Sequence, residues 1–356
     1  MPSLKEIKGR INSISSTLAI TSAMKMVAAA KLQKAQMAIQ NMLPYERRLH
    51  SMLIDLMGAM NISAAASEDG SVRGSGSAER GFDQSGDRLS LSNRHDLAGM
   101  DGAYSLMAQR EVRKVAIVAF ASNSSLCGAF NSNVIREATA VINEYRASGL
   151  GDADITVYSV GRKMAEAMKK LGFPSPADFT KMSDSPSYDA ASALAQELFD
   201  GFVSGRFDKV ELVYNHYKST SSQPTTRQTY LPLSLADATA DIQVGKITDS
   251  ASEPYTDKVA EPVVRQNSPT TETPDLIVEP SKEELIATLL PKVVRLRVFT
   301  TLLDSTAAEH AARTVAMQLA TDNGNDLLQE LTLEYNKGRQ QKITSEILDI
   351  VGGSLQ

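Results

Sequence analysis

The feature that most constrains the fold of this chain is a heptad repeat in its last stretch, residues 281–351. Small and apolar residues recur there at alternating steps of four and three, which places them on one face of a helix. The repeat comprises Leu289, Val293, Leu296, Thr300, Leu303, Ala307, His310, Thr314, Met317, Thr321, Gly324, Leu328, Leu331, Tyr335 and Gly338. A pattern much longer than about 25 residues is typical of a coiled coil. At about 1.5 Å per residue the helix would be on the order of 100 Å long, so it needs a long partner.

A matching repeat opens the chain and supplies that partner. Its positions are Leu4, Ile7, Ile11, Ile14, Leu18, Thr21, Lys25, Ala28, Leu32, Ala35, Ile39 and Met42. Both stretches begin with a capping-box pattern, a serine followed three residues later by a glutamate, at Ser3 and Ser281. Because the helices lie at opposite ends of the chain, we predict an antiparallel two-helix coiled coil. Pro44 and Pro291 should kink the helices near a common end.

The seams are not uniformly apolar, and Lys25, His310 and Gly324 occupy seam positions. Polar residues in a coiled-coil seam usually fix the register of the pair at some cost in stability. Contact with another protein is the alternative explanation for them. The pattern favours the register explanation and leaves the other open.

Composition excludes several classes of protein. The chain has 356 residues, a net charge of -5, no tryptophan and a single cysteine, Cys127. It has no apolar run of 18 residues that could span a membrane and no signal-peptide pattern at its start. One cysteine excludes an internal disulfide, and few aromatic residues argue against stacking on nucleic-acid bases. The histidines lack metal-ligand spacing; they are His50, His95, His216 and His310.

The region between the helices divides into three parts. Residues 61–110 are rich in Gly, Ser, Asp and Arg, and residues 237–280 in Thr, Ser, Asp and Pro. Such segments bury too little apolar surface to offset the entropy of ordering, so we predict two insertions, the first with a short helix near residues 97–107. Residues 111–236 between them have the composition and size of one compact domain.

That middle region alternates strand and helix patterns. Strands are expected over residues 114–120, 155–160 and 209–214, with an edge strand over 226–233, and helices over 131–145, 162–171 and 188–203. Alternating strands and helices predict an α/β sheet covered by helices. The fold class is therefore α/β plus long helices.

No catalytic site is apparent. The first strand-to-helix turn, residues 121–130, holds one glycine where a dinucleotide fingerprint needs three, and it has no P-loop lysine. Cys127 in that turn could be a nucleophile, but small buried cysteines are commoner. We therefore expect no catalytic residue, no cofactor and no metal, and a function that lies in the shape of the chain.

Several motifs carry a resemblance to a known family. Residues 19–31 (AITSAMKMVAAAK) strongly resemble the N-terminal signature of the gamma subunit of the F-type ATP synthase, and residues 126–131 (LCGAFN) its central motif. The C-terminal signature is matched by AARTVAM, ATDNG and YNKGRQ between residues 311 and 340, followed by Ile343-Thr344 and Glu346. The match covers both long helices and the α/β domain, without the insertions. Several motifs in the right order make it specific.

The resemblance implies a central rotor shaft of bacterial type. The coiled coil would lie inside a ring of alpha and beta subunits, and a Rossmann-like α/β domain would form the foot, next to the epsilon subunit and the membrane c-ring. Rotation would couple proton or sodium flow to ATP synthesis or hydrolysis. The chain itself would be non-catalytic, because the family's nucleotide sites lie on the partner subunits. It would be peripheral, at the cytoplasmic face of the bacterial inner membrane. The alternative is a structural coiled-coil tether that presents an α/β module without a rotary role.

Family positions near the tip of the shaft give the candidate contacts with the head. Arg339, Gln340, Thr344 and Glu346 match them, and Lys25 is a second contact candidate. A merely solvated helix face is the alternative explanation for the four tip residues. The C-terminal helix should outrun its partner there by roughly a dozen residues.

The chain departs from the family pattern in two places. Asn123-Ser124-Ser125 stands where the family usually has Asp-Arg-Gly. Neither insertion contains a cysteine, which excludes the thiol regulation of plant-type gamma subunits. Since one insertion follows the first long helix and the other precedes the last, we expect both at the foot.

Overall fold

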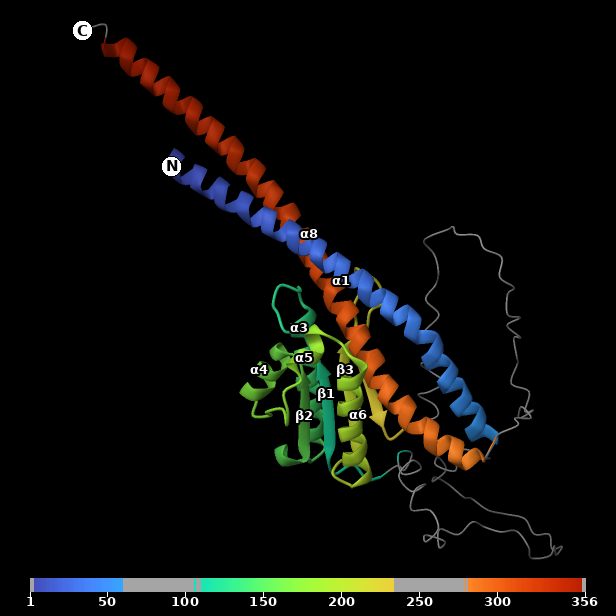
Figure 1. The fold of residues 1–356 in the computed structure, drawn as a ribbon. Helices are drawn as coiled ribbons and strands as arrows, with labels where there is room; N and C mark the ends of the chain where they lie inside the picture. Colours follow the sequence, from blue (N-terminus) through green and yellow to red (C-terminus); the bar gives the residue numbers. More distant parts are fainter. Residues whose placement is uncertain (1–2, 60–105, 107–109, 234–278, 280, 354–356) are drawn as a thin grey trace, which may run out of the picture.

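The computed structural model describes residues 3–59, 106, 110–233, 279 and 281–353 of the chain. Two long helices cross at a shallow angle, and a smaller α/β unit lies against one of them (Figure 1). The two predicted insertions, and the short helix expected near residues 97–107, fall almost wholly outside the described residues. Their placement at the foot therefore stays a prediction.

The order of elements follows the predicted alternation closely. The elements are α1 (Leu4–Ala59), β1 (Val115–Phe120), α3 (Phe130–Ala147), a 3-10 turn (Asp152–Asp154), β2 (Ile155–Val160), α4 (Arg162–Lys170), α5 (Thr180–Asp184), α6 (Tyr188–Val203), β3 (Lys209–Asn215), β4 (Thr225–Leu231) and α8 (Lys282–Gly353). Every predicted strand and helix of the middle region is present, with ends that agree to within about two residues. The 3-10 turn and α5 had not been predicted.

The long helices α1 and α8 pair antiparallel, as the two heptad repeats predict. A Cβ added at Gly338 would lie 3.1 Å from a methyl carbon of Leu4, and one at Gly324 would lie 2.6 Å from a methyl carbon of Leu18. Residue numbers therefore fall along α8 as they rise along α1. Both glycines allow close approach of the helices, because any larger side chain would meet a leucine of the partner.

Burial follows the predicted seam. Between residues 4 and 18 of α1, the side chains that are not fully exposed are those of Leu4, Ile7, Ile11, Ile14 and Leu18. Further along, the hydroxyl of Thr321 donates to that of Thr21 at 3.1 Å, so a polar pair crosses the seam in register. These observations confirm the coiled coil and its face.

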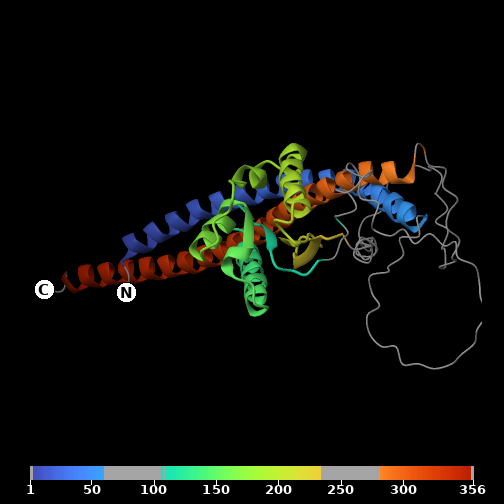
Figure 2. The same ribbon diagram turned by 90° about the horizontal axis from the view of Figure 1, so that it is seen from below.

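The starts of both helices are capped by serine. The hydroxyl of Ser3 accepts the backbone N–H of Glu6 at 3.2 Å, and that of Ser281 accepts the N–H of Glu284 at 3.1 Å. Both helices continue through their prolines without a break, and Pro44 lies in the half of α1 that bends in both views (Figures 1 and 2). None of the described helices is long and apolar enough to cross a membrane.

The sheet has the order β2-β1-β3-β4, with β4 antiparallel to β3 and the other pairs parallel. Side chains of β1 alternate between two cores. Val115, Ile117 and Ala119 face α3 and α4, whereas Ala116, Val118 and Phe120 belong to the core that holds residues of α6 and α8. The first half of α8 therefore has two roles: it covers one face of the sheet, and it is one of the two helices of the coiled coil.

One buried charge cluster lies in the sheet. Glu211 of β3 is 1% exposed, and its carboxylate accepts hydrogen bonds from Tyr145 at 2.6 Å and from Arg227 at 2.7 Å. Lys209 lies 2.7 Å from the same carboxylate. Burial would raise the pKa of Glu211, but the hydrogen bonds from Arg227, Lys209 and Tyr145 outweigh burial and lower it. The cluster joins β3, β4 and α3 on the face away from α8.

Candidate functional site

The candidate site is the free end of α8. Gly338 lies opposite Leu4, the first residue of α1, and α8 continues to Gly353. Residues 339–353 therefore extend α8 past the described start of α1 by about 22 Å. The C-terminal end of α8 projects beyond the start of α1 in both views (Figures 1 and 2). The predicted overhang of roughly a dozen residues is confirmed, and we call residues 339–353 the tip.

Every side chain from residue 341 to 348 is exposed. Apolar residues are prominent among the exposed side chains of the tip: Ile343, Ile347, Leu348, Ile350 and Val351. Ile350 is 72% exposed, the highest value among the large apolar residues that are exposed. Exposed apolar residues gathered in one place mark a surface that another molecule covers.

Four of the predicted contact residues lie together on the tip. Arg339, Gln340, Thr344 and Glu346 are all exposed there. Lys25 does not join them, because it lies half-buried in the seam of α1, about 30 Å from the tip along the shaft. Four of the five candidate contact residues thus lie together on the tip, and Lys25 lies apart from them on the paired part of the shaft.

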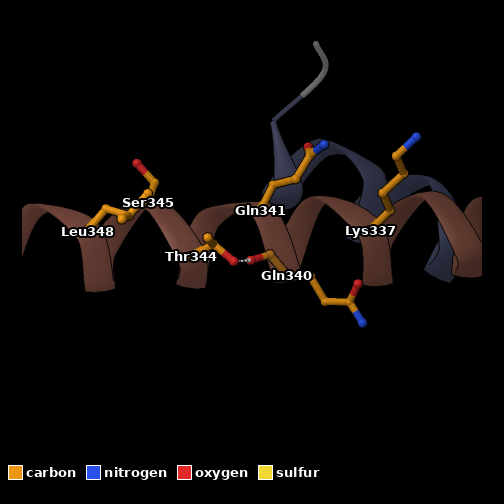
Figure 3. A pocket seen from close by; sticks show the side chains of 6 residues that line it. All are labelled: Lys337, Gln340, Gln341, Thr344, Ser345 and Leu348. Atoms are coloured by element: carbon orange, nitrogen blue, oxygen red, sulfur yellow. Dashed lines mark hydrogen bonds between the residues drawn. The ribbon is translucent and has the colours of Figure 1, made fainter.

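A shallow, open groove follows α8 at the start of the tip. Its lining residues are Lys337, Gln340, Gln341, Thr344, Ser345 and Leu348. Figure 3 shows the start of α1 behind Lys337 and Gln341, whereas Ser345 and Leu348 stand on α8 alone. The hydroxyl of Thr344 donates to the backbone carbonyl of Gln340 at 2.9 Å. The side chain of Gln340 points away from α1 (Figure 3).

The chemistry of the tip is that of a protein-contact surface. Its polar groups are amides, hydroxyls and a few charges, and Lys342 and Glu346 form an exposed ion pair at 3.8 Å. Exposed pairs of this kind contribute little to stability, so both charges remain usable by a partner. In the described parts of the chain, no group of three His, Cys, Asp or Glu side chains could hold a metal ion.

A second polar site joins α8 to the α/β unit. Arg313 donates to Glu309 at 2.6 Å and to the hydroxyl of Ser124 at 2.7 Å. Burial raises the pKa of Glu309 against the opposing effect of Arg313. The pKa of His310 is lowered to about 4, first by burial and then by the positive charges of Arg313 and Lys31.

The segment that departs from the family pattern forms contacts inside the chain. The Asn123 side chain accepts the N–H of Arg162 at 2.7 Å and donates to the carbonyl of Thr180 at 2.7 Å. Ser124 is the acceptor for Arg313. Asn123 and Ser124 therefore bind α4, α5 and α8 to the turn after β1.

Cys127 lies in the same turn and is 1% exposed. It packs beside Ala308 and Phe130, and the amide of Asn131 donates to its sulfur at 3.1 Å. It is a small buried side chain at the contact between the α/β unit and α8. These surroundings support a structural role for Cys127, which was expected from the sequence as the commoner case for a cysteine.

Comparison with known proteins decides the family. A family model described as ATP synthase matches residues 3–355. The chain is 48% identical to the ATP synthase gamma chain of Phocaeicola vulgatus over 355 residues, covering 100% of both chains. It belongs to the ATP synthase gamma-chain family. The gamma chain of Bacteroides thetaiotaomicron is 45% identical over 356 residues, again with 100% of both chains covered.

A solved structure gives the same fold. A chain of the mitochondrial ATP synthase of Euglena gracilis matches with a TM-score of 0.51 and 20% identity, covering 98% of this chain and 92% of that one. Family membership confirms the resemblance that the motifs carry, and it favours the role of a rotor over that of a tether. The exposed apolar residues of the tip are the part of the site that sequence reasoning missed. The sequence did contain a signal for this surface, because apolar residues continue beyond Gly338, the last glycine of the seam.

Proposed function

We propose that the chain is the non-catalytic central shaft of a rotary ATP synthase. Ion flow through a membrane c-ring would turn it, and the turning would drive ATP synthesis at an alpha/beta head, or run in reverse with hydrolysis. Residues 1–60 and 281–356 would form the shaft and residues 111–236 the foot, separated by insertions at 61–110 and 237–280. The protein would be peripheral, at the cytoplasmic face of the bacterial inner membrane.

One observation carries the proposal: α8 continues beyond Gly338 to Gly353, past the start of α1, and its exposed side chains there include Ile343, Ile347 and Ile350. A single helix with apolar side chains on its surface needs a surrounding surface to cover them. An alpha/beta ring would supply that cover. Below the tip the two helices support each other along the seam, as a shaft that transmits torque would require.

The proposed contacts with the head are Arg339, Gln340, Thr344 and Glu346 at the tip. Lys25 is proposed as a second contact, further down the shaft. Its neighbours Met26 and Val27 are 65% and 58% exposed, so this part of α1 also offers apolar surface to a partner. The epsilon subunit and the c-ring are proposed partners of the foot.

Rotation of a labelled foot tests the rotor role against the tether. Lys169 is exposed on α4, and the native Cys127 is buried, so Lys169→Cys gives one accessible thiol for a bead. With the head immobilised and ATP supplied, the bead should turn in one direction. A complex that assembles with alpha, beta and epsilon subunits and hydrolyses ATP with a stationary bead would support the tether instead.

Nucleotide binding tests the non-catalytic role. Because residues 121–130 lack a phosphate loop, the isolated chain should show no stoichiometric binding of ATP at micromolar concentration in equilibrium dialysis. The assembled head is the positive control. Stoichiometric binding by the chain alone would contradict this role.

A further inference from the structure

The connection between β3 and β4 touches both helices of the shaft. His216 Nδ1 lies 2.6 Å from Asp304 Oδ2 on α8, and the N–H of Tyr217 donates to Asp304 Oδ1 at 2.9 Å. The Tyr217 hydroxyl accepts a hydrogen bond from the Gln36 amide of α1 at 2.6 Å. Two adjacent residues of the α/β unit thus bind one residue on each long helix.

The connection is itself folded into a tight turn. The N–H of His216 donates to the carbonyl of Pro224 at 2.9 Å, which closes the base of the turn. The Gln223 amide donates to the carbonyls of Ser219 and Thr220 at 3.0 and 2.6 Å. These hydrogen bonds tie His216 and Tyr217 to the rest of the turn.

The apolar surroundings of the turn are slight compared with the core below it. Tyr217 packs at the edge of two small clusters, one formed by Leu32, Ala35, Ala307 and Ala311 and the other by Cys127, Phe130 and Ala308. Most of these side chains are alanines, which contribute little buried area. The polar contacts of the turn therefore matter more here than in the apolar core.

The contact with Asp304 is the one that changes charge near neutral pH. The hydrogen bond with Asp304 raises the pKa of His216, burial opposes the rise, and Lys218 in the same turn also opposes it. The neutral amide of Gln36 on α1 reaches the turn at Tyr217. Asn215, the residue before His216, bonds to the Thr225 hydroxyl of β4 and to the Phe130 carbonyl of α3, which are also uncharged. Side-chain exposure is 34% for His216 and 18% for Asp304, so the ion pair is partly shielded from water.

Two other contacts between the α/β unit and α8 lack this property. Arg295 donates to Gln196 at 2.6 Å, and Tyr230 donates to the carbonyl of Val294 at 2.9 Å. Neither donor loses its proton between pH 5 and 9. His216 is thus placed to make one of several domain-to-shaft contacts depend on pH.

We propose that residues 216–224 are a pH-dependent latch between the α/β unit and both helices of the shaft. The latch is closed when the His216 imidazolium pairs with Asp304, and it weakens when the imidazolium loses its proton. The raised pKa gives the sign: the stabilising effect is complete below the pKa of about 6.5 for a free histidine and is lost as the pH rises through the higher pKa of the closed latch. The latch is a contact within the chain and does not rest on the proposed rotor function.

Hydrogen exchange of the Tyr217 amide reads the latch directly, because that N–H is bonded to Asp304. In the assembled complex, mass spectrometry of the peptide that contains residues 216–224 is followed from pH 6 to pH 9 and corrected for intrinsic exchange. The opening equilibrium should rise as the pH increases from about 6.5 to the raised pKa of the closed latch, by up to about tenfold per pH unit, and should level off above that pKa. Peptides from β1, where every side chain is buried, should show no such trend.

Two variants separate charge from structure. A lysine keeps its charge up to about pH 10, so His216→Lys should hold the latch closed across the range with a flat profile. His216→Gln has no charge to lose, so its profile should again be flat, with faster exchange than wild type at pH 6 and similar exchange once the wild-type histidine is neutral. A flat wild-type profile, or a pH-dependent one in His216→Lys, would overturn the latch. Failure of the bead to rotate while the exchange profiles hold would refute the rotor role alone.

Discussion

The two halves of α8 carry one heptad repeat and have different surroundings. In the first half, seam residues such as Val293 and Ala307 are 2% and 0% exposed, because α1 lies on one side and the α/β unit on another. In the second half α1 is the one described element that accompanies the helix, and the seam residues Leu328 and Leu331 are only half-buried. Off the seam, Leu327 and Leu333 are 50% and 67% exposed. After Gly338 no helix accompanies α8 in the described part of the chain.

The two halves of α8 differ in burial although they share one heptad repeat, so the repeat specifies only part of the helix environment. The repeat fixes which face of the helix meets α1, and in the second half that face is the less exposed one. In the first half the seam residues Thr300 and His310 are only half-buried, while residues on other faces are fully buried. The repeat does not fix how many other elements cover the helix. A second stripe at steps of four, comprising Arg297, Thr301, Ser305, Glu309 and Arg313, is buried as well. Stability should therefore concentrate in the first half and exposed contact surface in the second.

A matched pair of leucine truncations provides the strongest test of this division. Leu290 is 1% exposed in the large core, whereas Leu328 lies half-buried in the seam above it. Leu290→Ala should lower the free energy of unfolding by about 2–5 kcal/mol, and Leu328→Ala by about 1 kcal/mol. Chemical denaturation of the full-length chain measures both, and equal losses would contradict the division.

Much of this arrangement could be predicted from the sequence, for identifiable reasons. Periodicity gave both long helices, their pairing and each strand of the sheet, because those elements bury one face in a regular pattern. α5 was missed, since five residues are too few to show a helical period. The polar stripe was missed because its partners, such as Ser124, come from elements distant in the sequence.

The candidate site was predicted unevenly for similar reasons. Family motifs gave Arg339, Gln340, Thr344 and Glu346, and the structure places all four on one unpaired stretch. Lys25 matched the same family, and the structure keeps it at its predicted seam position, half-buried and well below the tip. His216 and Asp304 are far apart in the chain, and their contact could be found only in the folded structure.

Two glycine substitutions compare the stability of the α/β unit with that of the shaft. Gly161, between β2 and α4, has a φ of +95°, and an added Cβ would lie 2.0 Å from the carbonyl oxygen of Ala121. Gly161→Ala should therefore cost about 1–3 kcal/mol or more of unfolding free energy. Gly9 on α1 has nothing within 4 Å of an added Cβ, so Gly9→Ala should gain up to about 1 kcal/mol from better helix propensity. Melting of both variants against wild type checks the signs, and a loss in Gly9→Ala would show an unrecognised constraint on the shaft.

Acid sensitivity should arise where the two halves meet. His310 has a pKa lowered to about 4, and its Nδ1 is buried without a hydrogen-bond partner among the described residues. A lowered pKa means that its contribution is complete above about pH 6.5 and is lost as the pH falls toward 4. Between pH 7 and 5 the loss should be about 1 kcal/mol, after allowance for partial exposure to solvent.

Thermal melting over that pH range compares wild type with His310→Leu. The variant carries no proton to gain, so its melting temperature should fall less on acidification. Parallel curves for the two proteins would assign the acid effect to other groups, such as the protonation of Glu309.

The smallest effect on stability should come from the tip, which is where the effect on function should be largest. Arg339 and Gln340 are exposed on an unpaired helix, so Arg339→Ala and Gln340→Ala should leave the melting temperature nearly unchanged. Both should lower ATP-driven ion pumping per ATP hydrolysed if the tip contacts the head. Gln329→Ala is the matched control, because Gln329 is exposed on α8 where α1 still accompanies it. If the tip variants lose melting temperature and activity in equal measure, or if Gln329→Ala impairs pumping as much as Gln340→Ala does, the tip has no special role and the contrast between the halves of α8 is one of stability alone.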